Sequence, residues 1–433
     1  MAAYSFGAGN ARKLLSIPLY AAGICLGAII PRSKTLWVFG CAVGVTDGAL
    51  ALWEVAHSRG ESTVWLVAND GEAHAAAARG IPHVPRNSLR GFWGTLRAAV
   101  IVITHGFGDV NRYAVTGAEI VQLWHGIPLK KIGVDSPVTL RNSILPRSRL
   151  VTAVLGGMYR GATRRISLIP AASHLVRGRL ESAFSLPDER VCVTGEPRVD
   201  VLSRGLPEQR YARAYRELER IVGPAQGRIV LYAPTWRDGD PDPAIPSPQQ
   251  WTRIDEMLNR VDATLLIRSH PLGVGSYHPP ESSTRIHALG SDLVADVTPL
   301  LPGIDVMITD YSSLLFDAGL VPMPVLFLAP DRDDYLARRG CYGSYQQITG
   351  GTEVRTWDEL LGQLTSILTD PDVAARFREQ SAHRSARFHD FRDGGNTERV
   401  YQAITVARAR KQASGRKRAR RRRSASTGSG GAQ

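Results

Sequence analysis

Short, uniformly apolar runs alternate with amphipathic segments along most of this chain. The runs occupy residues 36–40, 63–68, 98–106, 119–126, 166–172 and 191–194 in the first half, and 228–236, 264–271, 304–313 and 324–330 in the second. Between the first two runs, residues 47–58 have the pattern of a helix, and helical patterns dominate residues 357–399. Apolar strands separated by helices indicate parallel sheets that are covered on both faces.

The two successive arrays predict an α/β chain with two Rossmann-like domains whose parallel sheets face an interdomain cleft. A length of 433 residues is sufficient for two or three domains. The predicted divisions are an apolar, membrane-associating segment (1–33), an N-terminal Rossmann-like domain (34–200), a C-terminal Rossmann-like domain (201–406) and a disordered polybasic tail (407–433). Ligands of such sheets bind beyond the carboxyl ends of the strands.

The net charge of +13 is concentrated at the C-terminus. Ten Lys or Arg and no acid lie between Arg408 and Arg423, and subtracting them leaves only +3 for the rest of the chain. The stretch lacks the aromatic residues that stack on bases, and no nucleic-acid-binding signature accompanies it, which argues against a nucleic-acid partner. We therefore expect it to bind an anionic membrane surface, with a solvated, disordered tail as the alternative.

The N-terminus contains an uncharged and mostly apolar stretch from Leu14 to Ile30. Its 17 residues are at the lower limit for a transmembrane helix, and Pro18 and two glycines weaken such a helix. No small-residue cleavage site of a signal peptide is evident. We predict an interfacial, monotopic segment, with a true span as the alternative.

Several chemistries lack their sequence signatures. The four cysteines form no CxxC pair, so neither a disulfide framework nor a zinc site is indicated, and a reducing compartment is expected. The P-loop motif and a GxGxxG after the first strand are absent, as are GxSxG and HExxH. No carboxylate cluster indicates a metal site built by the protein, although Mg²⁺ can arrive bound to a diphosphate.

The stretch Val121 to Gly133, VQLWHGIPLKKIG, combines a titratable group with positive charge. An apolar strand is predicted to end at Trp124-His125-Gly126, and a helix is predicted to begin near Pro128 and to carry Lys130 and Lys131. An imidazole beside a helix N-terminus and lysines would suit a phosphate-transferring centre. The alternative is a core histidine on an ordinary turn between a strand and a helix.

The second half contains further polar residues at predicted strand ends. His270 ends the run IRSHP, so one imidazole from each domain would face the cleft as general base and acid. Ser312 and Ser313 open a helix after a buried strand, where hydroxyl and free N–H groups bind phosphate, and Asp317 follows one turn later. The alternatives are two unrelated turn histidines, and a serine N-cap with a solvated aspartate.

Other strand ends and turns supply a hydroxyl and arginines. Pro234 and Thr235 end a strand in APTWRD, which also contains Arg237. Arg198 lies in the turn GEPRVD, and Arg268 precedes His270 by two residues. Such arginines can neutralise a diphosphate, although each alone is more often a surface ion-pair partner.

Taken together, these stretches resemble the CDP-glycerol glycerophosphotransferase family, the teichoic acid primases and polymerases. The matching stretches, in the family's order, are WVFG, QLWHGIPLKKIG, GEPRVD, VLYAPTWRD, LLIRSHP, DVMITDYSSLLFD and DGGNTERV, between Leu36 and Val400. The resemblance implies a two-domain GT-B fold, with residues 34–200 on the acceptor side and residues 201–406 as the domain that binds CDP-glycerol. It also implies that an acceptor hydroxyl attacks the β-phosphate of CDP-glycerol, with release of CMP.

The resemblance also assigns site residues and partners. Trp124, Gly126, Ile127 and Pro128 would lie against the donor, with His125 as a catalytic candidate. The other donor-binding candidates are Arg198, Pro234, Thr235, Arg268, Ser269, Ser312, Ser313 and Asp317, beside His270 as the second catalytic candidate. The expected acceptor is a lipid-linked polyprenyl-diphosphate glycan or a growing teichoic acid, at the cytoplasmic face of the bacterial membrane.

Two positions depart from the family's pattern. The threonine that usually follows WHG is Ile127 here, and the aromatic residue that usually follows the glycine of GxPR is Glu196. The first change would remove a hydroxyl beside the donor, so the donor is either CDP-glycerol or CDP-ribitol.

The predicted mechanism uses His125 as general base on the acceptor hydroxyl, while His270 and Arg268 stabilise phosphate charge or assist the departure of CMP. Two alternatives come from other classes. A GT-B glycosyltransferase would act on a nucleotide-sugar and release, in most cases, a nucleoside diphosphate. A membrane-associated binding protein would hold a nucleotide-polyol without turnover and would tolerate changes at both histidines.

Overall fold

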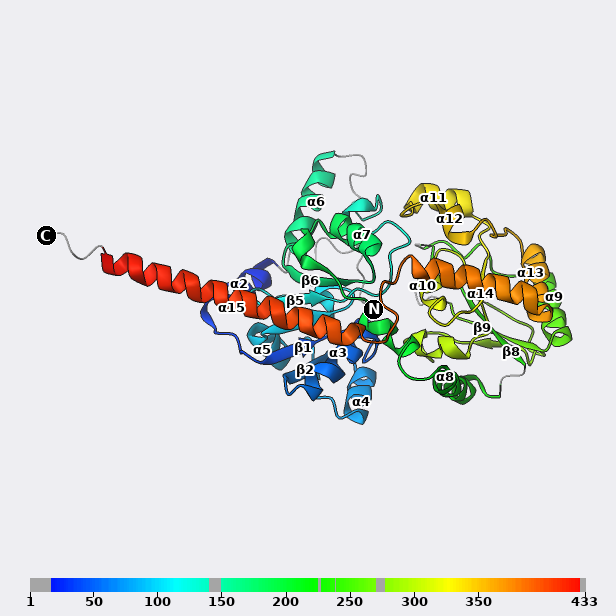
Figure 1. Cartoon of the computed structure of the whole chain (residues 1–433), viewed down its shortest axis with the longest axis horizontal. Helices are drawn as coiled ribbons and strands as arrows, with labels where there is room; N and C mark the ends of the chain where they lie inside the picture. Colours follow the sequence, from blue (N-terminus) through cyan, green and yellow to red (C-terminus); the bar gives the residue numbers. More distant parts are fainter. Residues whose placement is uncertain (1–16, 140–148, 225–226, 238, 270–276, 429–433) are drawn as a thin grey trace.

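Two α/β domains lie end to end in the computed structural model, and a long C-terminal helix runs back along the first of them (Figure 1). The structure describes residues 17–139, 149–224, 227–237, 239–269 and 277–428. Both sheets are wholly parallel, as the apolar runs predict.

The N-terminal domain is built on a seven-stranded sheet with the order β3-β2-β1-β4-β5-β6-β7. Its strands are β1 (Leu36–Phe39), β2 (Ser62–Val67), β3 (His83–Pro85), β4 (Val100–Ile103), β5 (Glu119–Gln122), β6 (Ile166–Ala171) and β7 (Val191–Val193). Six of them coincide with predicted apolar runs. The edge strand β3 is short and only half-buried, so it has no apolar run that could predict it.

The helices that cover this sheet are α2 (Ile17–Ile29), α3 (Asp47–Ser58), α4 (Asp70–Ala78), α5 (Leu89–Arg97), α6 (Arg149–Thr163) and α7 (His174–Phe184). Side-chain caps define several starts: Asn69, Ser88 and Ser173 each accept a hydrogen bond from the backbone N–H three residues on. Short 3₁₀ turns complete the domain at η1 (Phe107–Asp109), η2 (Gly133–Asp135), η3 (Asp188–Arg190) and η4 (Pro197–Leu202).

The C-terminal domain has a five-stranded sheet with the order β10-β9-β8-β11-β12. Its strands are β8 (Arg228–Ala233), β9 (Ala263–Ile267), β10 (Ile286–Ala288), β11 (Val306–Thr309) and β12 (Val325–Phe327). Its helices are α8 (Pro207–Val222), α9 (Pro248–Arg260), η5 (Thr298–Gly303), α10 (Leu314–Ala318), α11 (Arg332–Arg339), α12 (Tyr345–Thr349), α13 (Trp357–Thr369) and α14 (Pro371–Ala386).

Both sheets have the doubly wound strand order, in which the chain starts in the middle and proceeds outward in both directions. The direction changes between β1 and β4 in the first sheet and between β8 and β11 in the second. Ligands of such sheets bind at these points, beyond the carboxyl ends of the strands. The structure therefore confirms two Rossmann-like domains. The loops after β1, β4, β8 and β11 lie at the points where such domains bind ligands.

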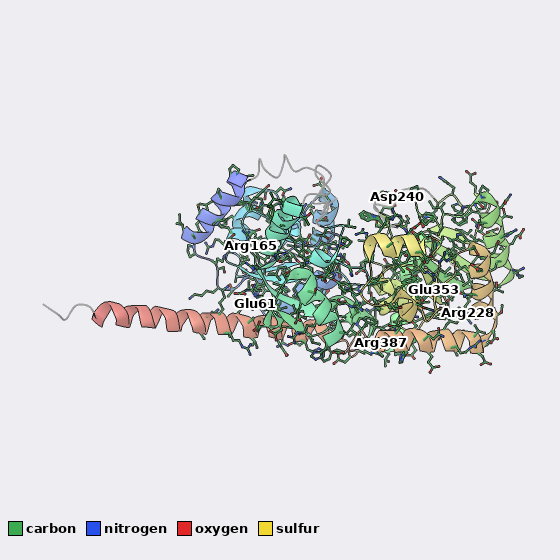
Figure 2. The ribbon with its side chains drawn as sticks, turned by 90° about the horizontal axis from the view of Figure 1, so that it is seen from above. Glu61, Arg165, Arg228, Asp240, Glu353 and Arg387 are labelled. Carbon is green, nitrogen blue, oxygen red and sulfur yellow. The ribbon has the colours of Figure 1, made fainter. Side chains whose placement is uncertain are left out.

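The last helix, α15 (Asn396–Gly428), belongs to the N-terminal domain rather than to the C-terminal one. Val400 and Ile404 are buried in the core that also contains Trp37, and the ring of Tyr401 stacks on that of Trp37 at 5.7 Å. Further along, Arg408 pairs with Glu61 at 3.4 Å, and Figure 2 shows Glu61 beside this helix. The chain thus returns to its first domain before residue 406, where the sequence places the boundary.

Helix α15 also continues through the stretch that the sequence predicts as a disordered tail. It extends to Gly428 and projects away from the body of the molecule in both views (Figures 1 and 2). Arg, Lys and Ala are good helix formers, so a charged stretch that follows an anchored helix can extend it.

The apolar N-terminal stretch forms α2, a helix of 13 residues that packs on the N-terminal domain. Gly23 and Gly27 face this contact, and a side chain at Gly23 would meet the carbonyl oxygen of Tyr113. No helix in the part of the chain that the structure describes is long and apolar enough to cross a membrane.

We expect Ile404→Ala to lower the free energy of unfolding by about 2–4 kcal/mol, because it opens a cavity between α15 and the N-terminal sheet. Val406→Ala is the matched control, since Val406 is on the same helix but exposed. Urea unfolding of both variants tests this. Equal stabilities of the two would contradict the assignment of α15 to the first domain.

Candidate active site

The ends of β4 and β5 meet the ends of β8 and β11 at the junction of the two domains. Thr104 and His105 follow β4, and the WHG sequence follows β5. From the other domain, Thr235 follows β8, and the segment 310–313 follows β11. These are the loops where doubly wound sheets bind ligands.

His125 is exposed to solvent but has protein groups on several sides. Its ring stacks on that of His105 with the centroids 4.1 Å apart and the planes 2° apart, and the ring of Trp124 lies at 4.2 Å. Its Nδ1 lies 3.5 Å from the carbonyl oxygen of Thr104, at the long end of hydrogen-bond distances. Protein groups packed around the ring exclude water from much of it, and this effect, helped by His105, Arg198 and Lys130, lowers the pKa of His125 well below 6.5. The imidazole is therefore neutral at neutral pH and has a free ring nitrogen.

Trp124 has a strained backbone that orients this histidine. Its φ of +63° is in the left-handed region, which residues other than glycine rarely adopt. Such a conformation costs of order 1–3 kcal/mol and persists only where the surroundings enforce it. Here the indole packs edge-on against Phe184, with the centroids 5.1 Å apart.

The helix predicted after Pro128 is absent, and this prediction is wrong. Ile127 and Leu129 are fully buried in the apolar core, and Lys130 pairs with Cys341 in an antiparallel β-bridge. The bridge is extended by hydrogen bonds from the N–H of Lys131 to Gly340 and from the N–H of Tyr342 to Leu129, at 3.1 and 2.9 Å. The segment is thus an extended link between the domains, and no helix begins at Pro128.

The burial of Ile127 bears on the departure from the family's threonine. Its side chain has no exposed surface and packs in the core. A threonine at this position would therefore alter the packing of the core in this conformation. Its hydroxyl group would not be exposed to a ligand.

Gly126 brings the two domains into close contact. Its φ is +136°, and a Cβ on it would lie 2.8 Å from Oγ of Ser313 and 3.4 Å from a terminal nitrogen of Arg198. Such a distance to Ser313 is shorter than real Cβ contacts, so only glycine fits here. WHG, the GEPRVD turn and the serines after β11 therefore meet at one point.

Arg198 is the charged centre of this contact. Its side chain is only 8 % exposed and pairs with Asp317 of the other domain, while its Nε donates to Glu196 at 3.2 Å. Burial would lower the pKa of Arg198, but Asp317, Glu196 and Asp47 outweigh it and raise this pKa. Arg198 thus remains charged and joins the domains through a buried ion pair.

Burial has the opposite effect on the carboxyl groups around Arg198, because it raises the pKa of an acid. Burial raises the pKa of Glu196 to about 7 and that of Asp47 to about 6, and it also raises the pKa of Asp317. Arg198 opposes the rise in all three cases. Asp317 has no exposed surface, so in this conformation it holds Arg198 rather than a ligand.

Asp317 has a second buried neighbour, His389. Nε2 of His389 lies 3.7 Å from the free oxygen of Asp317, and neither atom has a hydrogen-bond partner among the described residues. Burial, together with Arg198, lowers the pKa of His389 to about 3. His389 is therefore a neutral group that packs against the ion pair.

On the C-terminal side, Asp310 fixes the position of Thr235. Its carboxylate accepts the N–H of Thr235 at 2.8 Å and pairs with Arg237 at 2.8 Å. Oγ1 of Thr235 is buried without a hydrogen-bond partner in the described part of the chain. Pro234 beside it is buried, whereas Ser312 and Ser313 are half-buried. Thr235 and Ser313 are thus available hydroxyl groups.

The remaining arginines have structural partners. Arg237 pairs with Asp331 as well as Asp310. Arg268 donates to the carbonyl groups of residues 289, 294 and 295. Ser269 is half-buried at the edge of the described region, and the prediction for His270 lies outside the described residues.

The described residues contain no group of three or more His, Cys, Asp or Glu side chains arranged for a metal ion. The arrival of Mg²⁺ with a diphosphate stays a prediction.

Sequence reasoning missed His105 and His389. His105 follows the end of β4, the strand beside β5, and because neighbouring parallel strands end at the same sheet edge, it lies next to His125. The pattern of an apolar run followed by histidine in two successive strands was the available signal. His389 precedes DGGNTERV but has no such pattern, since its partner Asp317 is distant in sequence.

Comparison with known proteins agrees with this arrangement. The model of the family described as CDP-Glycerol:Poly(glycerophosphate) glycerophosphotransferase matches residues 36–406. A teichoic acid glycerol-phosphate transferase of Staphylococcus aureus is 27% identical over 372 residues, which cover 83% of this chain and 89% of the relative. A teichoic acid poly(glycerol phosphate) polymerase of Staphylococcus epidermidis is 28% identical over 235 residues, 52% of this chain and 31% of that protein.

The fold is shared with a solved structure of the wall teichoic acid polymerase TagF. The TM-score is 0.74 at 20% identity, and the match covers 93% of this chain and 97% of the other. The model of the family spans both sheets and the junction between them. This chain therefore belongs to the CDP-glycerol:poly(glycerophosphate) glycerophosphotransferase family.

Proposed function

We propose that this chain transfers glycerol phosphate from CDP-glycerol to a hydroxyl group of a teichoic acid or a related acceptor and releases CMP. Membership of the family supports the reaction, and the relative from S. aureus, of which the chain covers 89%, supports glycerol rather than ribitol. Two ribitol-phosphate polymerases of S. aureus are 24% identical and match over 65% of this chain.

The observation that carries the proposal is a neutral, solvent-exposed imidazole at the junction of the two domains. A general base must be unprotonated and must reach the acceptor hydroxyl. His125 fulfils the first condition, because the protein groups packed around its ring and the positive charge nearby keep its pKa well below 6.5. Its exposure supports the second, because an incoming hydroxyl can approach it from solvent.

In the proposed step, a ring nitrogen of His125 takes the proton of the acceptor hydroxyl as its oxygen attacks the β-phosphorus. A bond forms between this oxygen and phosphorus, and the bond to the bridging oxygen of the diphosphate breaks. CMP leaves with the electron pair, and the proton on His125 passes to solvent. If Nδ1–H is directed at the carbonyl group of Thr104, Nε2 is the nitrogen that accepts the proton.

We assign the phosphate contacts to Arg198 and Ser313. Both lie against Gly126, the residue that follows His125 in the chain. A guanidinium and a hydroxyl can both donate hydrogen bonds to the phosphate oxygens, whose charge changes during transfer. Thr235, whose hydroxyl is buried and without a partner in the described residues, is a third donor.

We further propose peripheral attachment to the cytoplasmic face of the membrane. Leu150, Val154 and Met158 form an apolar stripe at four-residue spacing on α6 and are 75, 55 and 62 % exposed. On α2 and α5, Ile29, Leu89 and Trp93 are also exposed. Apolar residues on surface helices enter the lipid interface, and the basic stretch from Arg408 to Arg423 adds attraction to anionic lipids.

The donor is tested by incubating the protein with CDP-glycerol, CDP-ribitol or a panel of nucleotide-sugars plus membrane acceptor. We expect CMP release with CDP-glycerol. A nucleoside diphosphate released from a nucleotide-sugar would instead indicate a glycosyltransferase. Release of CMP only from CDP-ribitol would show that the transferred group is ribitol phosphate. No turnover with any donor, despite donor binding, would favour the binding protein.

We expect His125→Ala to lower the rate of CMP release by about 10²- to 10⁴-fold, because general base catalysis is lost. Its thermal unfolding should match that of the wild type, since the side chain is exposed. His57→Ala is the matched control, because His57 is exposed and stacks on Trp53 away from this junction. Wild-type CMP release by His125→Ala would exclude it as the base.

We expect Gly126→Ala to reduce turnover by about 10²-fold, because its Cβ would displace Ser313 or His125 by a fraction of an ångström or more. The control is Gly157→Ala on α6, where an added Cβ meets no atom within 4 Å. Both variants are assayed for CMP release. Equal activities would show that the close contact at Gly126 is not needed.

We expect two different losses of vesicle binding. The double variant Val154→Asp/Met158→Asp should bind anionic vesicles more weakly at low and at high salt, because apolar burial is lost. Removal of residues 414–433, which contain seven Lys or Arg, should weaken binding only at low salt. Leu293→Asp, a change at an exposed leucine of the other domain, is the control. Unchanged binding by both test proteins would contradict this attachment.

A further inference from the structure

The stacked pair of His105 and His125 joins two neighbouring strands. Ile103 of β4 is in register with Gln122 of β5, so the two loops leave the sheet side by side. The centroid distance of 4.1 Å and the angle of 2° mean that the two flat rings cover each other. A ring held in this way cannot tilt toward or away from a substrate without losing the contact.

The loop that contains His105 is firmly fixed. One carboxylate oxygen of Asp109 accepts the backbone N–H groups of Thr104, His105 and Gly106 at 2.9, 2.7 and 3.2 Å. Asp109 itself is fully buried. His105 Nδ1 also lies 2.9 Å from the hydroxyl group of Thr104. His105 is thus a rigid support and not a mobile surface residue.

The same loop reaches His125 at a second point. The carbonyl oxygen of Thr104 accepts a hydrogen bond from the side-chain amide of Gln122 at 2.7 Å and lies 3.5 Å from Nδ1 of His125. One contact therefore fixes the plane of the His125 ring, and the other favours the tautomer with the proton on Nδ1. Together they leave Nε2 as the acceptor of a proton.

We propose that His105 is a positioning residue for His125, which holds the ring of the base in the plane and tautomer required for proton transfer. The inference rests on the proposed function, because it assumes that His125 is the base. It assigns no contact between His105 and the substrate.

The inference predicts a specific pH effect as well as a loss of rate. The titratable or charged groups around His125 are His105 from the β4 loop, Arg198 from η4 and Lys130 from the link between the domains, with Asp109 behind His105. Burial lowers the pKa of His105 as well. Burial contributes most to the lowered pKa of His125, and His105 contributes next. The ring of His105 covers one face of His125. Its removal opens that face to water, so the pKa of His125 should rise toward its ordinary value. The acid limb of the kcat profile then moves to higher pH.

The test compares His105→Ala and His105→Phe with the wild type in CMP release from CDP-glycerol across pH. We expect His105→Ala to lower kcat by about 10²-fold, as misplacement of a catalytic group does, without a change in the KM for CDP-glycerol. Its acid limb should lie at higher pH than that of the wild type. His105→Phe retains a flat ring in the stack, so it should recover most of kcat, with an acid limb below that of the alanine variant. His57→Ala again serves as the control for loss of a stacked histidine.

Wild-type kcat and an unmoved acid limb in His105→Ala would overturn the inference, and so would equal losses in the alanine and phenylalanine variants. If His105→Ala does not fold, His105→Phe is compared with the wild type alone. Retention of most of the wild-type kcat would support the inference, and loss of kcat as large as that expected for His105→Ala would overturn it. Loss of turnover in His125→Ala without loss in His105→Ala would contradict the role of His105 and leave the proposed function intact. Full turnover in His125→Ala removes the proposed function itself.

Discussion

The buried ion pair between Arg198 and Asp317 determines how the two domains meet. Transfer of each ion from water into the interior costs several kcal/mol, and their mutual attraction offsets this cost only while both partners are in place. The pair therefore favours the arrangement in which Gly126 contacts Ser313, the point at which the first sheet meets the second. The location of His125 beside Arg198 and Ser313 is a consequence of this contact.

Two of the matching sequence stretches, GEPRVD and DGGNTERV, have contacts that hold the chain together where the domains meet. Asp200 of GEPRVD accepts the backbone N–H groups of Asn396 and Thr397 at 3.0 and 2.8 Å, and thereby caps the start of α15. The side-chain amide of Asn396 donates to the carbonyl group of Glu196 at 3.2 Å. A side chain at Gly195 would collide with Asn396. The GEPRVD turn and DGGNTERV thus form one structure where the chain crosses back to its first domain.

The fold was more predictable than the site because apolar runs report burial, and burial on both faces requires parallel strands. The predictions that failed concerned residues whose structure depends on contacts between distant segments of the chain. Pro128 and the two lysines satisfy local rules for a helix start, but Lys130 instead pairs with Cys341 of the other domain. His125 and Thr235 could be selected because each ends an apolar run. The stack with His105 required knowledge of which strands are neighbours, and the burial of Asp317 could not be inferred from a serine-rich turn.

The central claim is that the β-phosphate of the donor binds where Gly126, Arg198 and Ser313 meet, within reach of His125. The structure of the wild-type chain in complex with CDP-glycerol tests it most directly. The account predicts that β-phosphate oxygens lie at hydrogen-bond distance from the Arg198 guanidinium and the Ser313 hydroxyl. The ring of His125 should face the side from which an acceptor hydroxyl attacks the phosphorus. A diphosphate bound away from Gly126, with His125 beyond the reach of such a hydroxyl, would contradict it.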